Sequence, residues 1–535
     1  MDKIIYNPLE EFEGKYKSLH EKNTAEFFSR LVTTSGIDAL ENRKCVKEYA
    51  SLTENLKKLK RKLLLLKILR VILFITLILI PLAILMITPK IKKLREDVDL
   101  CDKKARDLLD LMWQQMNPLN SLFTNRDALC LIEKTIPLVK FDRVFDAEKE
   151  EDMKINYDFS GTGDGNESTL DVLAGDYNGN PFLFENKLVH TMGMETYHGY
   201  KTIHWTERVH DANGKSRTVS RSQTLHATVT KPKPFYSTQV VLNYCAQGGP
   251  DLCFTRDATH LHRKSDREIE RYVKKGEKRL KRKTDKAIEK GQDFVSMSNT
   301  DFEVLFDALD RNDEVQFRTL FTPLAQTNMV DLLLSDKGFG DDFNFIKRRR
   351  TNKIVSNHSQ SRDINLSPDK YASYSFDIIE ANFKGKNAEF FKAVYFDFAP
   401  VLAIPIYQER PVNSLKPIPN SSRLYAFKEC EALANALPPD KVVHPRTRTK
   451  AILKSDFLGC ENGIEETCVT AFSYDIEKRV DVVSMMGGDG RLHSVPVEWD
   501  EYLPLTQTTD FYISSTDLAK GRSTLTSRNG ICIYN

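Results

Sequence analysis

The sequence lacks the short motifs that mark the common enzyme classes. Its 535 residues contain no CxxC pair, GxSxG nucleophile elbow, HExxH zinc motif, EF-hand loop or protein-kinase set. Their absence excludes those families, because each motif sets reacting groups at a fixed spacing. An excess of charge is also missing, since 78 basic residues face 75 acidic ones. A chain with such balanced charge does not bind polyanions along its whole length, although local basic patches could still do so.

Cysteine is present without the spacing of a metal site. Among nine cysteines, Cys245 and Cys253 are eight positions apart, as are Cys460 and Cys468, which is too wide for a zinc knuckle. We therefore expect reduced thiols packed as small apolar groups, with no metal and no cofactor. Free thiols favour a reducing compartment. The N-terminal segment has no apolar run, so no cleavable signal peptide is expected.

One apolar run stands out from a polar chain. Residues 63–89 read LLLLKILRVILFITLILIPLAILMITP, and positions 71–89 carry no charge. A helix rising about 1.5 Å per residue needs about 20 apolar residues to cross a bilayer. The run therefore predicts a transmembrane helix in the cell membrane, with the lipid bilayer as partner.

The orientation of this predicted anchor stays open. Basic residues flank it in nearly equal number on both sides, so the positive-inside rule does not decide. A shallow hairpin bent at Pro81 is the alternative to a single span. We expect one span with the large soluble domain on the cytoplasmic side, because of its free thiols.

The remaining segments predict an α+β protein with a mixed, largely antiparallel β-rich region. Helical patterns surround the apolar run, and from about residue 155 strand-like alternation begins, with turn dipeptides at Asn178-Gly179 and Asn213-Gly214. Strands are also predicted at 373–380 and 391–407. The predicted divisions are a helical region 1–62, the transmembrane segment 63–89, a helical, coiled-coil-like stalk 90–150, an α+β domain 151–410, a linker 411–422 and a β-rich domain 423–535.

Histidine and glycine clusters are candidates for metal-binding and phosphate-binding sites. His190, His198, His204 and His210 could meet across a hairpin, but no carboxylate stands at ligand spacing, so surface or core positions are expected. The glycine cluster at 160–166 lacks the lysine of a phosphate loop and predicts a turn. The alternative enzyme would be a membrane-bound hydrolase or transferase, with a Cys or Ser meeting His444 or His493.

A basic helix is the strongest candidate for binding. Residues 263–290 hold 13 basic and 6 acidic side chains on a helical pattern. This charge predicts attraction to anionic lipid headgroups; nucleic acid is not expected, because Tyr272 is the one aromatic among the basic residues. A second basic patch is expected at 346–350. The predicted contact residues are Lys274, Lys275, Lys278, Arg279, Lys281, Arg282 and Lys283.

Residues 299–334 carry a resemblance to a known family. An acidic-aromatic entry and a Leu-Thr-Pro helix start map onto Asp301, Phe302, Phe306, Arg318, Leu320, Thr322 and Pro323, with Phe321 inserted. The pattern resembles an uncharacterised bacterial membrane-protein family, with a domain of unknown function, often found beside LemA. The resemblance covers about residues 50–360. It implies a membrane-anchored soluble domain and supplies no catalytic residues.

These observations predict a binding or scaffolding module at the inner face of the membrane rather than an enzyme. The β-rich region would offer surfaces to a protein partner, and the basic helix would contact lipid headgroups.

Overall fold

The computed structural model describes residues 4–75, 87–160, 165–210, 216–291, 294–411, 416–419, 421–514 and 532–534. These residues form two compact units. Unit 1 contains residues 1–9, 138–364 and 396–535, and unit 2 contains residues 10–137 and 365–395. Both are built from segments distant in sequence, so each core depends on long-range packing.

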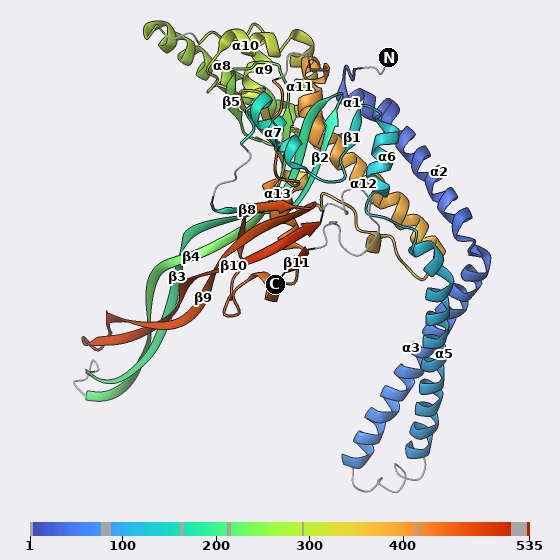
Figure 1. The fold of residues 1–535 in the computed structure, drawn as a ribbon. Helices are drawn as coiled ribbons and strands as arrows, with labels where there is room; N and C mark the ends of the chain where they lie inside the picture. Colours follow the sequence, from blue (N-terminus) through green and yellow to red (C-terminus); the bar gives the residue numbers. More distant parts are fainter. Residues whose placement is uncertain are drawn as a thin grey trace. The chain divides into compact units, whose positions relative to one another are not determined.

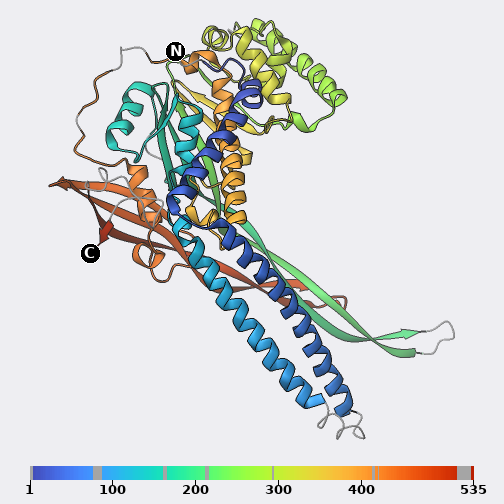
Figure 2. The same ribbon diagram turned by 90° about the vertical axis from the view of Figure 1, so that its right-hand side faces the viewer.

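Unit 2 is helical (Figures 1 and 2). Its core is aromatic: Phe28 and Phe123 contact Phe383, and Phe12 contacts Phe391, with ring centroids 5.4–5.8 Å apart. Its elements are η1 (Phe12–Tyr16), α2 (Lys17–Ser35), α3 (Ala39–Ile75), α5 (Thr88–Asn120), α6 (Asp127–Thr135) and the part of α12 (Phe376–Leu402) up to residue 395.

Helices α3 and α5 pair as an antiparallel hairpin (Figure 2). Leu63 of α3 packs on Ile87 and Ile91 at one end of the pair. Asn42 of α3 donates to Gln115 of α5 at the other end, over 3.3 Å. The apolar stripes of the two helices therefore pack against each other.

The predicted transmembrane anchor is wrong for the described chain. Of its range 63–89, residues 76–86 lie outside the described residues, while residues 63–75 end α3 and residues 88–89 begin α5. No helix among the described residues is long and apolar enough to cross a membrane. The reason is local: Lys67 and Arg70 interrupt the described part of the run, and Leu63 is buried against α5.

Unit 1 is built on two antiparallel sheets, in keeping with the α+β prediction (Figure 1). A seven-stranded sheet has the order β1-β2-β3-β4-β7-β6-β5, and a four-stranded sheet has the order β11-β10-β9-β8. The strands are β1 (Val139–Phe141), β2 (Glu167–Tyr177), β3 (Asn180–His210), β4 (Ser216–Cys245), β5 (Cys253–Arg256), β6 (Phe343–Arg348), β7 (Thr351–Ser356), β8 (Ile452–Glu461), β9 (Ile464–Met486), β10 (Leu492–Ser514) and β11 (Cys532–Tyr534).

Two very long hairpins, β3–β4 and β9–β10, extend beyond the sheets and pack on each other (Figure 1). Ile203, Leu225 and Ala227 of the first meet Val495 and Val497 of the second in a buried cluster. A side chain at Gly199 would lie 2.2 Å from the Pro496 carbonyl oxygen, so the close approach of the hairpins requires glycine there.

The helices of unit 1 lie before and between these strands. They are α1 (Pro8–Glu11, up to residue 9), α7 (Ala147–Tyr157), α8 (Asp266–Glu289), α9 (Thr300–Phe306), α10 (Glu314–Leu320), α11 (Pro323–Leu334), the end of α12, α13 (Phe427–Asn435) and α14 (Pro439–Val442), with short 3₁₀ turns at Leu261–Arg263, Asn357–Ser359 and Pro405–Gln408. The strands predicted at 373–380 and 391–407 are wrong, since most of both ranges lies in α12. A short apolar run rich in aromatic residues fits a buried helix and a buried strand equally well.

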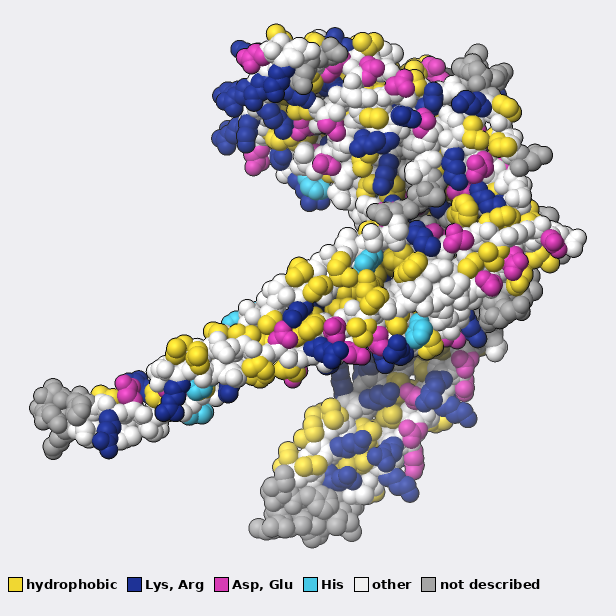
Figure 3. Space-filling view, turned by 60° about the vertical axis from the view of Figure 1, so that its left-hand side comes forward, with side chains coloured by type: hydrophobic (Ala, Val, Ile, Leu, Met, Phe, Trp, Pro, Cys, Tyr) yellow, Lys and Arg dark blue, Asp and Glu magenta, His cyan; other side chains and the backbone are white. Residues whose placement is uncertain are grey.

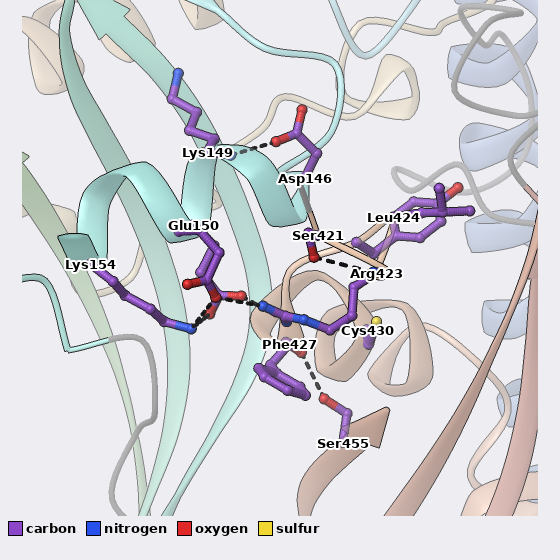
Figure 4. A network of polar contacts seen from close by, with 12 residues as sticks. Asp146, Lys149, Glu150, Lys154, Ser421, Arg423, Leu424, Phe427, Cys430 and Ser455 are labelled. Carbon is purple, nitrogen blue, oxygen red and sulfur yellow. Dashed lines mark hydrogen bonds and ion pairs between the residues drawn. The ribbon is translucent and has the colours of Figure 1, made fainter. Parts of the chain in front are cut away.

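A buried ion-pair network joins α7 to the segment before α13 (Figure 4). The Glu150 carboxylate is fully buried. It accepts a hydrogen bond from Arg423 over 3.0 Å and forms an ion pair with Lys154 over 3.3 Å. The Arg423 guanidinium also lies over the Phe427 ring, 4.1 Å from its centroid. Residues more than 250 positions apart are thereby fixed together, because a buried carboxylate needs its cations.

Candidate functional site

Helix α8 begins at a capping box formed by Ser265 and Glu268. The Ser265 backbone N–H and hydroxyl both donate to the Glu268 carboxylate, over 2.9 and 2.7 Å. These hydrogen bonds lower the pKa of Glu268. The predicted basic helix at 263–290 is confirmed as Asp266–Glu289, and its start follows from this local motif.

One side of α8 packs closely on α9. Leu280 and Ala287 are buried, and Gly276 lies so close to Val304 that an added Cβ would be 2.2 Å from Val304 Cγ1. Because the small and apolar residues occupy the packed side, the long basic side chains remain on the rest of the helix surface.

The basic side chains of α8 surround a hollow of about 730 Å³, which we call the basic hollow. Figure 3 shows Lys and Arg side chains gathered over this helix. Among the described residues, no side chain of the lining is acidic, and the lining positions recur at helical spacing on one face. The lining residues are Tyr272, Lys275, Gly276, Lys278, Arg279, Arg282, Lys283 and Lys286.

Two of these cations are held by the protein itself. Arg279 donates to Asp307 over 2.6 Å, and this hydrogen bond raises the pKa of Arg279. Lys283 donates to the Leu309 carbonyl oxygen and lies 4.0 Å from the Phe294 ring centroid. Burial lowers the pKa of Lys283, with the nearby Arg311 charge adding to the effect.

The other four cations of the hollow are exposed. Lys275, Lys278, Arg282 and Lys286 form no ion pair within the described part of the chain. Like charges this close on one helix face repel one another, so bringing them together without carboxylates costs stability. An anionic ligand would remove that repulsion, which makes the basic hollow the best candidate for binding.

The structure separates the predicted contact residues into two groups. Lys275, Lys278, Arg279, Arg282 and Lys283 line the basic hollow, whereas Lys274 and Lys281 lie on α8 outside its lining. Lys286 was missed by the sequence prediction. Lys286 lies 11 positions after Lys275, on the same face of the helix, and this helical spacing in the sequence could have identified it.

The second predicted basic patch, at 346–350, does not form an open cationic surface. Lys347 is fully buried and donates to the carbonyl oxygens of Gly248 and Arg349, over 2.9 and 2.5 Å. Burial lowers the pKa of Lys347 to about 7. Arg349 and Arg350 both pair with Asp158. Most of the basic side chains in this stretch are therefore engaged in contacts within the protein.

His190, His198, His204 and His210 all belong to strand β3, so they are spread along one strand and do not face one another across a hairpin. His198 Nδ1 and His226 Nε2 are 2.9 Å apart on the β3–β4 hairpin, and His262 Nδ1 accepts from the Asp341 backbone N–H. Within the residues that the structure describes, no group of three or more His, Cys, Asp or Glu could hold a metal ion.

The two histidines of the enzyme alternative have other partners. His493 Nε2 lies 3.0 Å from both Asp489 carboxylate oxygens, and His444 Nδ1 accepts from the Arg446 backbone N–H over 3.2 Å. In the described structure neither ring hydrogen-bonds a Ser or Cys side chain. The hydrolase or transferase alternative stays a prediction.

Comparisons of this chain with protein-family models, with curated proteins and with solved structures find no match. The resemblance to the LemA-neighbour family therefore stays a prediction, and the basic hollow stands on its geometry.

Proposed function

We propose that this protein is a binding module whose basic hollow on α8 holds clustered phosphate groups, such as those of anionic lipid headgroups or of a soluble polyphosphate. The observation that carries the proposal is six cationic side chains around one hollow whose described lining contains no acidic residue. Arg side chains bind phosphate oxygens in a bidentate fork, and Lys side chains supply point charges beside them.

The surroundings of the hollow favour phosphate clusters over single-stranded nucleic acid. Stacking of bases needs exposed aromatic faces. Tyr272 is the aromatic residue in the lining, and Lys264 Nζ already lies over its ring, 4.5 Å from the centroid. The hollow therefore offers charge without a stacking platform.

The test compares two variants of the full chain that each remove four positive charges, one from α8 alone and one from α8 and its C-cap residue Lys290. The hollow variant changes Lys275, Lys278, Arg282 and Lys286 to Gln. The matched control changes Arg271, Lys274, Lys281 and Lys290 to Gln, all of which are exposed and outside the lining. Both variants keep the packed residues Gly276 and Leu280. The control should melt like the natural chain, and the hollow variant should melt at the same or a higher temperature, because removing like charges relieves their repulsion.

Binding is measured to tripolyphosphate, and to phosphatidylcholine vesicles with and without phosphatidylglycerol, at several salt concentrations. We expect the hollow variant to bind about tenfold or more weakly and to lose most of the salt dependence, because each basic side chain near an anionic surface contributes about 1 kcal/mol before screening. The control should lose much less. Binding to tripolyphosphate alone identifies a soluble ligand, and binding to anionic vesicles identifies headgroups.

Two results would overturn the proposal. Equal losses in the hollow variant and the control would show that charge on α8 acts without the hollow. Tight binding of a short DNA duplex with no binding of either phosphate probe would assign the face to nucleic acid instead.

A further inference from the structure

Unit 1 contains a second hollow, unrelated to α8, of about 710 Å³. We call it the apolar cavity. It lies between β2 and β3 on one side and the segment from the end of α13 to the start of β8 on the other. Its volume falls within the range of about 300–1,000 Å³ typical of small-molecule sites.

The body of the apolar cavity is hydrocarbon. Leu170 and Leu188 come from the large sheet, and Leu437, Val443 and Leu453 come from the C-terminal segment. Leu170 sits at a β-bulge, where the pairing of β2 with β3 skips from Thr169 to Asp171. A bulge leaves one residue out of the ladder and turns its side chain, and here that residue lines the cavity.

The wall of the cavity continues into a well-packed cluster. Ala434, Val442 and Leu453 line the cavity and also belong to the buried cluster that contains Val469 and Phe511. Because the lining is fixed by this cluster, the cavity is a preformed part of the fold.

Most polar groups of the lining are already engaged. The Asn435 amide donates to the Ser168 hydroxyl and to the Thr169 carbonyl oxygen. The Thr447 hydroxyl is 2.7 Å from that of Ser473, and the Thr449 hydroxyl accepts from the Tyr474 backbone N–H.

The remaining donors are the N–H group of a histidine and the ammonium group of a lysine. His444 accepts at Nδ1 from the Arg446 backbone N–H, so its Nε2 carries the proton and can donate. Lys450 is exposed at the cavity and forms no ion pair in the described part of the chain. Asp440, the carboxylate of the lining, faces Lys441 at 3.9 Å. The opening thus has donors for an anionic group above an apolar interior.

We propose that the apolar cavity binds a small amphiphile with an aliphatic body and one carboxylate, with the carboxylate between Lys450 and His444. Burial of the aliphatic body supplies the affinity, at about 25 cal/mol for each Å² removed from water. The charge-assisted hydrogen bonds to the carboxylate supply the preference for an acid over an alcohol.

The experiment uses the full chain and the fluorescent acid 11-(dansylamino)undecanoate. We expect saturable, blue-shifted emission that dodecanoate displaces better than dodecanol does. Ala451→Phe, which places a ring in the cavity, should abolish binding. Lys450→Ala should weaken dodecanoate about tenfold and leave dodecanol unchanged, since it removes one charge-assisted hydrogen bond to the carboxylate. Arg448→Ala is the matched control, since Arg448 is an exposed cation two positions before Lys450 and lies outside the lining.

Each contrary outcome overturns a stated part of the proposal. Without saturable emission, or with unchanged binding in a folded Ala451→Phe variant, the cavity is not the site. If Lys450→Ala weakens dodecanol as much as dodecanoate, the carboxylate assignment is wrong. A folded state is checked by thermal melting, and Val443→Trp serves as a second filling variant if Ala451→Phe melts early. The hollow variant of α8 should bind the probe normally, so the two proposals fail independently.

Discussion

At the scale of single residues, surroundings decide whether a charge is available. Lys278 and Lys347 are both lysines in basic stretches of the sequence. Lys278 is exposed at the basic hollow, whereas Lys347 is buried among carbonyl oxygens with its pKa lowered to about 7. Composition alone counts both as positive, but desolvation disfavours the charged form of the second.

His20 offers a pH test at this scale. Its ring is buried in unit 2, stacks on Phe391 at 4.1 Å, and lies 3.2 Å from the Thr135 hydroxyl. Burial lowers the pKa of His20 to about 4, and the backbone of Asn387 offsets only part of this effect. In the unfolded chain the pKa is about 6.5, so below that pH the unfolded state binds the proton first.

The contribution of His20 to the stability of unit 2 should therefore fall by about 3 kcal/mol as the pH falls from about 6.5 to 4, and should not change further below that range. His20→Gln, which does not titrate, should flatten the loss in urea unfolding over the same range. NMR of ¹³C-labelled histidine gives the pKa directly. A His20 titration near 6.5 would contradict the burial argument.

At the scale of elements, helix α8 combines a packed side with a charged side. The packed side depends on Gly276, whose lack of a side chain admits Val304. A glycine inside a helix lowers the stability by about 0.5–1 kcal/mol relative to alanine. The close contact with Val304 explains why glycine nevertheless occupies this position.

Two glycine-to-alanine changes test this contact. Gly276→Ala should destabilise unit 1 by about 1–3 kcal/mol, because the new Cβ overlaps a β-branched side chain that cannot swing away. Gly385→Ala in α12, where nothing lies within 4 Å of the added Cβ, should stabilise unit 2 by about 0.5–1 kcal/mol. Thermal melts measure both. A stabilising Gly276→Ala would show that α8 does not pack on α9 as described.

At the scale of the whole molecule, each unit has its own core built from separate segments. Arg423 holds the buried Glu150 in unit 1, and Phe383 lies at the centre of the aromatic core of unit 2. Units with separate cores open in separate cooperative steps.

Hydrogen exchange with mass spectrometry can follow those steps. Arg423→Ala leaves a buried carboxylate short of a partner and should lower the protection of unit 1 by about 3–5 kcal/mol. Phe383→Ala opens a cavity and should lower that of unit 2 by about 3–5 kcal/mol. Each change should leave most of the other unit protected. Equal loss of protection in both units, from either change, would show one cooperative body.

Features that depend on neighbours along the chain follow from the amino-acid sequence alone. The capping box at Ser265 and Glu268 and the Asn178-Gly179 turn, with φ of 50° and 86°, follow from local chemistry. The positive charge of residues 263–290 and the α+β class could also be predicted, because helical and strand periodicities are local patterns.

Features that depend on distant segments are set by long-range packing. The antiparallel pairing of α3 with α5 uses Leu63, which the sequence presents as part of a membrane span. The burial of Lys347 and the placement of Leu170 and Leu453 in one cavity lining bring together residues whose spacing in the sequence carries no signal. Such contacts are selected by packing of the whole core, and a local pattern cannot report them.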